Sequence, residues 1–224
     1  MTCLVALPSG GNALLASGSN DKTVRVWGND VCLLKLQGHT ATVTCLAVPS
    51  GVGASLASCS KDKTVRIWCN GRCLRILRGH TAAVTCLAVL ADRFLVSAGE
   101  DGTLRWWKST SSSCLHTING VATDVTCVLP SSLPHSLFTV GATSGTLIQV
   151  EDGVVLGTTQ LQAGLSCLAL MPDGKGVCGF RDDRGTLQLW GPDGNTVFTT
   201  MHQSSVHPVS IRASENPHPP VVHT

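Results

Sequence analysis

The sequence predicts an all-β protein built from repeated units, and two observations carry this prediction. The first is a fixed spacing, because His39 and His80 lie 41 residues apart and Trp27 and Trp68 lie 41 residues apart as well. The second is the pattern of the chain, which has 23 glycines, short alternating apolar stretches and no helical periodicity. A period of about forty residues indicates stacked units, each of which buries its faces only against its neighbours.

The clearest unit runs from Gly38 to Trp68. It contains a Gly-His pair, an apolar strand, a small-residue strand, the turn Lys61-Asp62-Lys63 and a strand that ends in the tryptophan. With Gly-His early and Trp late, the unit resembles the WD-repeat family, and the resemblance covers nearly all of the chain. It implies a β-propeller of five four-stranded blades, an incomplete ring of a larger, seven-bladed propeller.

The spacing also predicts the domain boundaries. We expect blades at about residues 1-37, 38-78, 79-119, 120-160 and 161-201, followed by a disordered tail at 202-224. Units four and five are degenerate: Asn119-Gly120 replaces Gly-His in unit four, and unit five lacks this pair too. The unit-five turn from Arg181 to Thr186 carries one extra residue, and a fourth strand is expected at 196–200.

Charge and hydropathy exclude several classes of protein. The net charge is +2 and only 13% of the residues are charged, so no basic stripe indicates a nucleic-acid partner. No apolar stretch approaches the ~20 residues of a membrane helix. The stretch from Met1 to Pro8 lacks the positive region of a signal peptide. We therefore expect a soluble protein of the cytoplasm and the nucleus, with no membrane partner.

Eleven cysteines would suggest a disulfide scaffold in a short secreted chain, but here their positions follow the repeat. Five share one place in the first strand of each unit: Cys3, Cys45, Cys86, Cys127 and Cys167. This pattern is typical of a small hydrophobic residue at equivalent core positions, and it favours a reducing compartment.

The resemblance assigns a structural network to the motif residues of units two and three. Its members are His39, Ser58, Asp62 and Trp68 in one blade and His80, Ser97, Asp101 and Trp107 in the next. Serine, histidine and aspartate also form a hydrolase triad. A catalytic site is needed once, whereas this set recurs once per repeat, so the pattern favours an architectural role and a protein that is not an enzyme.

Other chemical motifs are weak. Cys69 and Cys73 form a close pair, but no second pair lies at zinc-like spacing, so we expect no metal site. Asp173-Gly174-Lys175-Gly176 is typical of a hairpin turn and lacks the pattern of a phosphate-binding loop. We accordingly expect no cofactor and no small-molecule substrate, and a protein or peptide as partner.

Partners of a propeller bind where inter-strand loops gather. The resemblance implies that the residue before the aspartate of each turn between the second and third strands lies on a loop face of the propeller. The residues at which the first strands begin lie nearby. The predicted partner-binding residues are Asn20, Thr42, Lys61, Ala83, Glu100, Thr143 and Asp182. The alternative, that they are only polar turn residues, is equally open.

A finer resemblance lies in the joins between blades. Trp27-Gly-Asn-Asp-Val-Cys, Trp68-Cys-Asn-Gly-Arg-Cys and Leu104-Arg-Trp-Trp107 are similar to later blades of the phospholipase-A2-activating protein family. That family implies a non-catalytic, ubiquitin-binding adaptor for an AAA-type segregase in ubiquitin-dependent protein degradation. The alternative is another WD-repeat adaptor, either a substrate receptor of a ubiquitin ligase or a signalling scaffold.

Ring closure is the last expectation. A propeller usually closes by letting an N-terminal strand complete the last blade, which hides sheet edges. This chain starts at the innermost strand of unit one, and no additional strand is available for closure. We therefore predict that the isolated chain is marginally stable or self-associating.

Overall fold

All of the regular secondary structure is β. The computed structural model describes residues 1–8, 14–49, 55–90, 94–130, 138–161, 164–170, 176–180 and 187–190. Within these ranges there are nineteen strands, and no helix there could cross a membrane. The strands form five antiparallel sheets, and in each sheet neighbouring strands follow one another in the chain.

Each sheet is one blade, and the first four blades each hold four strands. Blade one holds β1 (Cys3–Leu7), β2 (Leu14–Gly18), β3 (Val24–Gly28) and β4 (Val31–Leu36). Blade two holds β5 (Val43–Ala47), β6 (Ser55–Ser60), β7 (Thr64–Cys69) and β8 (Arg72–Arg78). Blade three holds β9 (Val84–Leu90), β10 (Phe94–Gly99), β11 (Thr103–Lys108) and β12 (Cys114–Asn119).

Blades four and five follow the same plan. Blade four holds β13 (Val125–Pro130), β14 (Phe138–Ala142), β15 (Thr146–Glu151) and β16 (Val154–Gln160). The described part of blade five holds β17 (Leu165–Leu170), β18 (Gly176–Phe180) and β19 (Leu187–Trp190). The fourth strand expected at 196–200, the turn from Arg181 to Thr186 and the tail at 202–224 lie outside the described residues.

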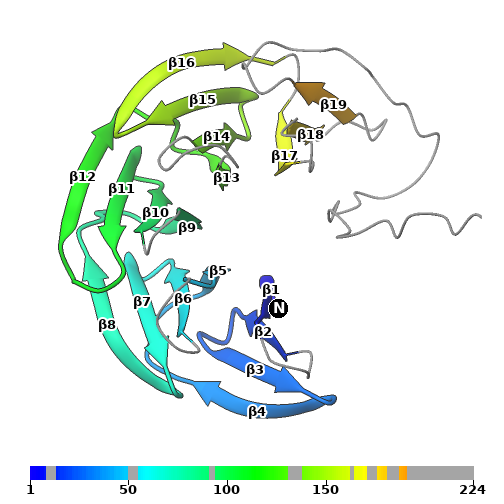
Figure 1. Cartoon of the computed structure of the whole chain (residues 1–224), viewed down its shortest axis with the longest axis vertical. Coiled ribbons are helices and arrows are strands. Elements are labelled where there is room, and N and C mark those ends of the chain that lie inside the picture. Colours follow the sequence, from blue (N-terminus) through cyan, green and yellow to red (C-terminus); the bar gives the residue numbers. More distant parts are fainter. Residues whose placement is uncertain are drawn as a thin grey trace, which may run out of the picture.

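The five blades stand around an open arc (Figure 1). The first strand of each blade lies nearest the centre, and β4, β8, β12 and β16 form the outer rim. Inner strands contact one another in chain order, β1 with β5, β5 with β9, β9 with β13 and β13 with β17. Blades one and five are the two ends of the arc, so the described residues form the incomplete propeller ring that the sequence predicts.

The core lies between successive blades, because each central blade is apolar on both faces. Val65 and Ile67 point from β7 toward blade three, whereas Trp68 packs against blade one. The seam between blades one and two is built from Ala16, Val24, Val26, Leu46, Leu56 and Trp68. The next seam is built from Ala57, Val65, Ile67, Leu87, Leu95 and Trp107. Burying one such leucine contributes roughly 1.5–3 kcal/mol.

The turns between the second and third strands are tight, and one position in each has a left-handed backbone. Gly102 has a φ of 68° and Gly145 a φ of 84°, a region that glycine adopts without steric cost. Lysine takes the same place in blades one and two, where Lys22 and Lys63 both have a φ of 70°. The repeated backbone geometry explains why the residues beside these turns take equivalent places in successive blades.

One assignment from the sequence is wrong by one residue. Asn119-Gly120 was expected at the Gly-His position of blade four. The β11–β12 register pairs Thr103 with Asn119, whereas β7 pairs Thr64 with Arg78. Asn119 therefore matches Arg78, and Gly120-Val121 takes the Gly-His position.

Candidate functional site

The first network links the end of blade one to three strands and turns of blade two. His39 follows β4, Ser58 lies on β6, Asp62 lies in the β6–β7 turn and Trp68 lies on β7. His39 Nδ1 is 2.8 Å from Asp62 Oδ2, and its Nε2 is 2.8 Å from Ser58 Oγ. Because the carboxylate only accepts, Nδ1 donates to it, and Nε2 accepts the serine hydroxyl. Trp68 Nε1 donates to the same Ser58 Oγ over 2.7 Å.

Asp62 holds the network to the surrounding backbone. The Thr40 amide donates to its Oδ2 over 3.0 Å, and Thr64 Oγ1 donates to its Oδ1 over 2.6 Å. Burial opposes ionisation of the carboxyl, but the hydrogen bonds from His39 and Thr64 outweigh it and hold the pKa of Asp62 well below its ordinary value. The carboxylate therefore stays charged and paired.

Blade three repeats the arrangement. His80 Nδ1 is 3.0 Å from Asp101 Oδ2, and its Nε2 is 2.7 Å from Ser97 Oγ. Trp107 Nε1 donates to Ser97 Oγ over 2.8 Å. Burial lowers the pKa of His80, although Asp101 partly offsets this. Burial of Asp101 is outweighed by hydrogen bonds, chiefly from Thr103, which lower its pKa to about 2.

In these two blades the glycine of the Gly-His pair lies close to an arginine side chain. A Cβ at Gly38 would lie 2.7 Å from Arg66 Nη1, and one at Gly79 would lie 2.7 Å from Arg105 Nη1. Each arginine lies against the residue that precedes the network histidine. In blade four Ile148 takes the arginine position, and a Cβ at Gly120 would meet nothing within 4 Å.

The geometry decides between an architectural and a catalytic use of the two networks. Ser58 and Ser97 are completely buried, and each Oγ already accepts an indole N–H. A substrate carbonyl has no approach to either hydroxyl. Their arrangement fixes a loop from one blade to the strands of the next.

Blade four replaces the polar set with an apolar one. Val121, Val140 and Val150 stand where blade three has His80, Ser97 and Trp107, and all three valines are buried in one cluster. Because every member is replaced together, no donor or acceptor is left unpaired. Ser144 stands at the aspartate position, and its amide donates to Asp124 Oδ2 over 2.6 Å.

Blade one carries only part of the network. Trp27 Nε1 donates to Ser17 Oγ over 2.8 Å, as in the later blades. Asp21, at the aspartate position, accepts from Thr23 and pairs with Arg25 over 2.8 Å. No described residue of this blade places a histidine beside Ser17.

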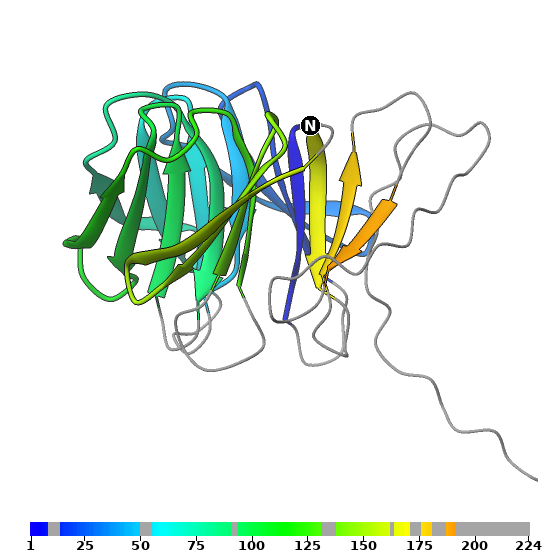
Figure 2. The same ribbon diagram turned by 90° about the horizontal axis from the view of Figure 1, so that it is seen from above.

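The predicted partner-binding residues meet in pairs at one end of the blades. The Lys61 amide donates to Thr42 O over 2.9 Å, and the Glu100 amide donates to Ala83 O over 2.8 Å. The antiparallel order puts the β6–β7 turn and the start of β5 at the same end, and the strands run between two opposite loop faces (Figure 2). Asn20, Lys61 and Glu100 are exposed, Thr42, Ala83 and Thr143 are half-buried, and Asp182 lies outside the described residues.

Sequence reasoning missed one member of this face. Asp124 takes the place of Thr42 and Ala83, since the Thr143 amide donates to its carbonyl over 3.0 Å. The signal was available, because Asp124 lies 41 residues after Ala83, which lies 41 after Thr42. We define the turn face as Asn20, Thr42, Lys61, Ala83, Glu100, Asp124 and Thr143; it carries one cation, Lys61, beside the carboxylates of Glu100 and Asp124.

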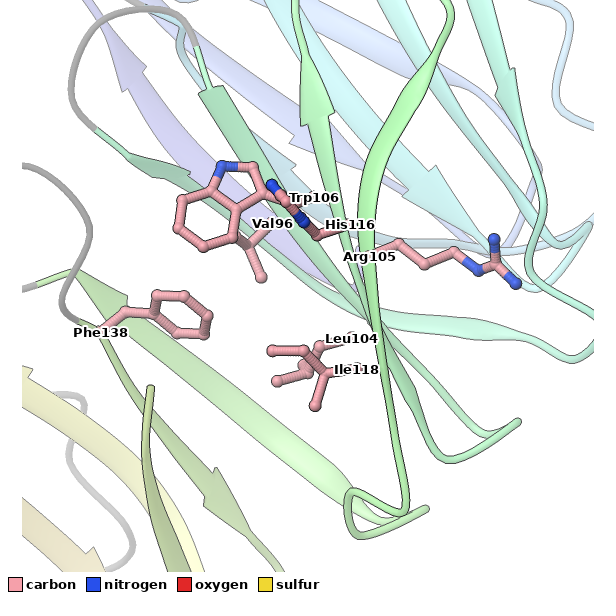
Figure 3. Close-up of a pocket in the computed structure, with 7 residues that line it drawn as sticks. All are labelled: Val96, Leu104, Arg105, Trp106, His116, Ile118 and Phe138. Carbon is pink, nitrogen blue, oxygen red and sulfur yellow. The ribbon is translucent and has the colours of Figure 1, made fainter. Parts of the chain in front are cut away.

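A second candidate site is a small pocket at the seam between blades three and four (Figure 3). Trp106 meets Phe138 edge-on with ring centroids 5.7 Å apart, and it meets His116 at 6.0 Å. Val96, Leu104 and Ile118 complete an apolar lining. The rings pack against each other across the seam, so these residues join two blades.

Comparison with known proteins agrees with the geometry. The family model described as WD domain, G-beta repeat matches residues 1–28, 30–69 and 71–108. A solved structure, the WD40 beta propeller domain of Doa1, matches with a TM-score of 0.71 and 25% identity over 82% of this chain. The chain is a WD-repeat β-propeller. It spans 62% of the Doa1 domain. No curated protein matches it significantly.

This result sets the class of function. WD-repeat propellers are generally non-catalytic modules that bind other proteins. The chain is therefore interpreted as a protein-interaction scaffold, whose candidate contact surface is the turn face.

Proposed function

We propose that this WD-repeat propeller is an adaptor in ubiquitin-dependent protein degradation and that its turn face binds ubiquitin. The observation that carries the proposal is a repeated backbone hydrogen bond, from Lys61 to Thr42, from Glu100 to Ala83 and from Thr143 to Asp124. It places three successive turns in the same position on three rigid blades. Rigid scaffolds that present short loops in this way are suited to binding another protein.

Two similarities to other proteins support ubiquitin as the partner. The joins after Trp27 and Trp68 resemble those of the phospholipase-A2-activating protein family, and the Doa1 propeller domain is similar in fold. An AAA-type segregase complex is the further partner in this proposal, and the cytoplasm and nucleus are the expected sites of action. Fluorescence microscopy of the tagged chain tests the location.

The charge of the turn face bears on the alternative partners. A receptor for phosphorylated peptides needs several cations on one face, because phosphate is bound best by clustered arginines. Among the described residues of the turn face only Lys61 is basic, and two acidic residues lie on the following blades. This favours a partner with mixed surface charge over a phosphopeptide. A ubiquitin-ligase substrate receptor or another signalling scaffold is the alternative function.

The test is an NMR titration of isotope-labelled mono-ubiquitin with the folded chain. We expect amide shifts that cluster on one ubiquitin surface. Lys61→Glu and Glu100→Lys should each weaken binding by about 1 kcal/mol, roughly fivefold, because they reverse charges at the contact.

Matched controls are Lys35→Glu on β4 and Lys108→Glu at the end of β11, both exposed and outside the turn face. They should leave the affinity unchanged. An unchanged ubiquitin spectrum with a folded sample would refute ubiquitin binding. Clustered shifts that ignore both turn-face variants would instead place the contact on another surface.

A further inference from the structure

The first strand of each blade carries a cysteine, and in every blade but the second a small residue faces it on the neighbouring strand. The strand registers pair Cys3 with Gly18, Cys86 with Ala98, Cys127 with Gly141 and Cys167 with Gly179. In blade two Cys45 on β5 instead faces Cys59 on β6. Blade two therefore places a second thiol where the repeat otherwise has a glycine or an alanine.

The glycines show how closely the first-strand cysteine approaches the residue that faces it. A Cβ at Gly18 would lie 2.5 Å from Cys3 Sγ, and one at Gly141 would lie 2.9 Å from Cys127 Sγ. In a disulfide each sulfur lies about 3 Å from the Cβ of its partner, because the two atoms are two bonds apart. Facing residues of an antiparallel pair have Cα atoms about 4.5–5.5 Å apart, within the range that disulfides span. The repeat geometry thus brings a cysteine sulfur to the distance that a bond to a facing cysteine requires.

The two thiols of blade two are in contact, and a third approaches from blade three. The Cys45 sulfur accepts hydrogen bonds from the thiols of Cys59 and Cys86, which hold the pKa of Cys45 well below its ordinary value although burial opposes ionisation. Burial, together with the bond to Cys45, raises the pKa of Cys59. Cys45 is half-buried and Cys59 is completely buried. Cys45 is therefore the more reactive sulfur, and Cys59 is a thiol held beside it.

Cys86 is less suited than Cys59 to form a bond with Cys45. It lies on β9 of blade three, where Leu87 O is 3.6 Å from Cys45 Sγ. Packed sheets lie about 10 Å apart, so a disulfide between them would have to draw two blades together. Cys59 needs no such movement, because β5 and β6 are already hydrogen-bonded neighbours in one sheet.

We propose that Cys45 and Cys59 form a site of reversible oxidation, at which a peroxide converts the two thiols to a disulfide across β5 and β6. The Cys45 thiolate attacks one oxygen of hydrogen peroxide, the O–O bond breaks, and Cys45 becomes a sulfenic acid. The hydroxide that leaves takes up the proton that Cys45 released. The Cys59 sulfur then attacks the Cys45 sulfur, the S–O bond breaks, and the hydroxide leaves with the Cys59 proton as water. In total, two thiols and one hydrogen peroxide give one disulfide and two waters.

The disulfide would tether β5 to β6 directly below the turn face. Cys45 lies three residues after Thr42, and Cys59 lies two residues before Lys61. Thr42 and Lys61 are themselves joined by a backbone hydrogen bond. Oxidation would also remove the thiolate that accepts the Cys86 thiol, so it changes the seam between blades two and three. The site is independent of the proposed ubiquitin contact, because its chemistry requires only the two thiols and a peroxide.

Titration of the folded, reduced chain with hydrogen peroxide, followed by alkylation and peptide mass spectrometry, tests the proposal. We expect one disulfide, between Cys45 and Cys59, that dithiothreitol reverses. Cys59→Ala copies the alanine of blade three, so it should abolish the disulfide and leave Cys45 as a sulfenic acid that dimedone traps. Cys127→Ala is the matched control, because Cys127 takes the place of Cys45 in blade four but faces Gly141. It should form the disulfide as the unmodified chain does.

Circular dichroism before and after oxidation establishes that each sample is folded, and Cys59→Gly, which copies blades one and four, serves if Cys59→Ala unfolds. The exposed Cys32 on β4 is the internal reference. It should remain a thiol at the peroxide concentration that converts half of the Cys45–Cys59 pair. A folded chain in which Cys45 and Cys59 stay reduced overturns the proposal, as does a bond from Cys45 to Cys86. Equal oxidation of Cys32 and Cys45 would also overturn it, in favour of unselective oxidation.

Discussion

Blades three and four fill equivalent buried positions with different kinds of side chain, polar and hydrogen-bonded in blade three and apolar in blade four. Blade three places His80, Ser97 and Trp107 in a hydrogen-bonded chain, and blade four places Val121, Val140 and Val150 at the same positions. Both sets are buried and both leave their members satisfied. The comparison teaches that these positions act as a unit, which tolerates a complete polar set or a complete apolar set.

The strongest way to break this unit is to exchange its largest member alone. Trp107→Val introduces the blade-four residue at a fully buried position of blade three. The change removes a large side chain and the indole donor of Ser97, so we expect a loss of about 3–5 kcal/mol of unfolding free energy. Urea denaturation of the purified chain measures it. A loss below about 1 kcal/mol would show that the seam relaxes around the smaller residue.

A second exchange tests whether the members are coupled. Ser97→Val alone leaves His80 Nε2 and Trp107 Nε1 without their shared partner, which should cost about 2–3 kcal/mol. Adding His80→Val removes the unpaired His80 Nε2. The double variant should therefore lose about 1 kcal/mol less unfolding free energy than the sum of the two single variants. Denaturation of the single and double variants completes the cycle. Strict additivity would mean that the three side chains act independently.

Acidification should weaken blade three more than blade four. Burial holds the pKa of His80 below its ordinary value of 6.5, so the unfolded chain binds a proton at a higher pH than the folded chain does. Stability is therefore full above about pH 6.5 and is lost as the pH falls toward the folded pKa. The pKa of Asp101, about 2 in place of 3.8, adds a further loss below pH 4.

Thermal melting between pH 7.5 and pH 4 measures this decline. The triple variant His80→Val, Ser97→Val, Trp107→Val, which copies the blade-four set into blade three, should show a shallower decline. An equal slope in both proteins would assign the acid sensitivity to other groups.

The smallest effect is expected from a partial return to the polar set in blade four. Ser144→Asp restores the turn aspartate but leaves Val121 at the histidine position. The new carboxylate would also lie beside Asp124, whose Oδ2 accepts the amide of residue 144. We expect a change within about 1 kcal/mol, and a destabilising one, because like charges repel and no imidazole is gained. A stabilisation measured by urea denaturation would contradict this.

The sequence predicts the repeated parts of this molecule well because each imposes a spacing. His39, Ser58, Asp62 and Trp68 recur 39 to 41 residues later as His80, Ser97, Asp101 and Trp107, and the structure brings each set within hydrogen-bonding distance. In blade four the network residues are replaced, so no motif marks the repeat spacing there. Asn119-Gly120 was therefore misplaced by one residue, and only the strand register corrected it.

The turn face was harder to predict for a different physical reason. Exposed residues such as Lys61 and Glu100 obey no packing constraint, so their identity does not reveal their position or their partner. Asp124 was missed because blade four lacks the Gly-His pair that marks the repeat, although Asp124 keeps the 41-residue spacing from Ala83. The backbone hydrogen bond from Thr143 establishes the equivalence.

Each network histidine lies in the connection between two blades and is bound inside the second of them. His39 follows β4 yet is bound inside blade two, and His80 follows β8 yet is bound inside blade three. Blades one to three are thereby joined across two seams by buried hydrogen bonds, whereas the seam to blade four has only apolar contacts at these positions. In native-state hydrogen exchange, the amides of blades two and three should open as one cooperative block, and those of blade four should open at lower free energy.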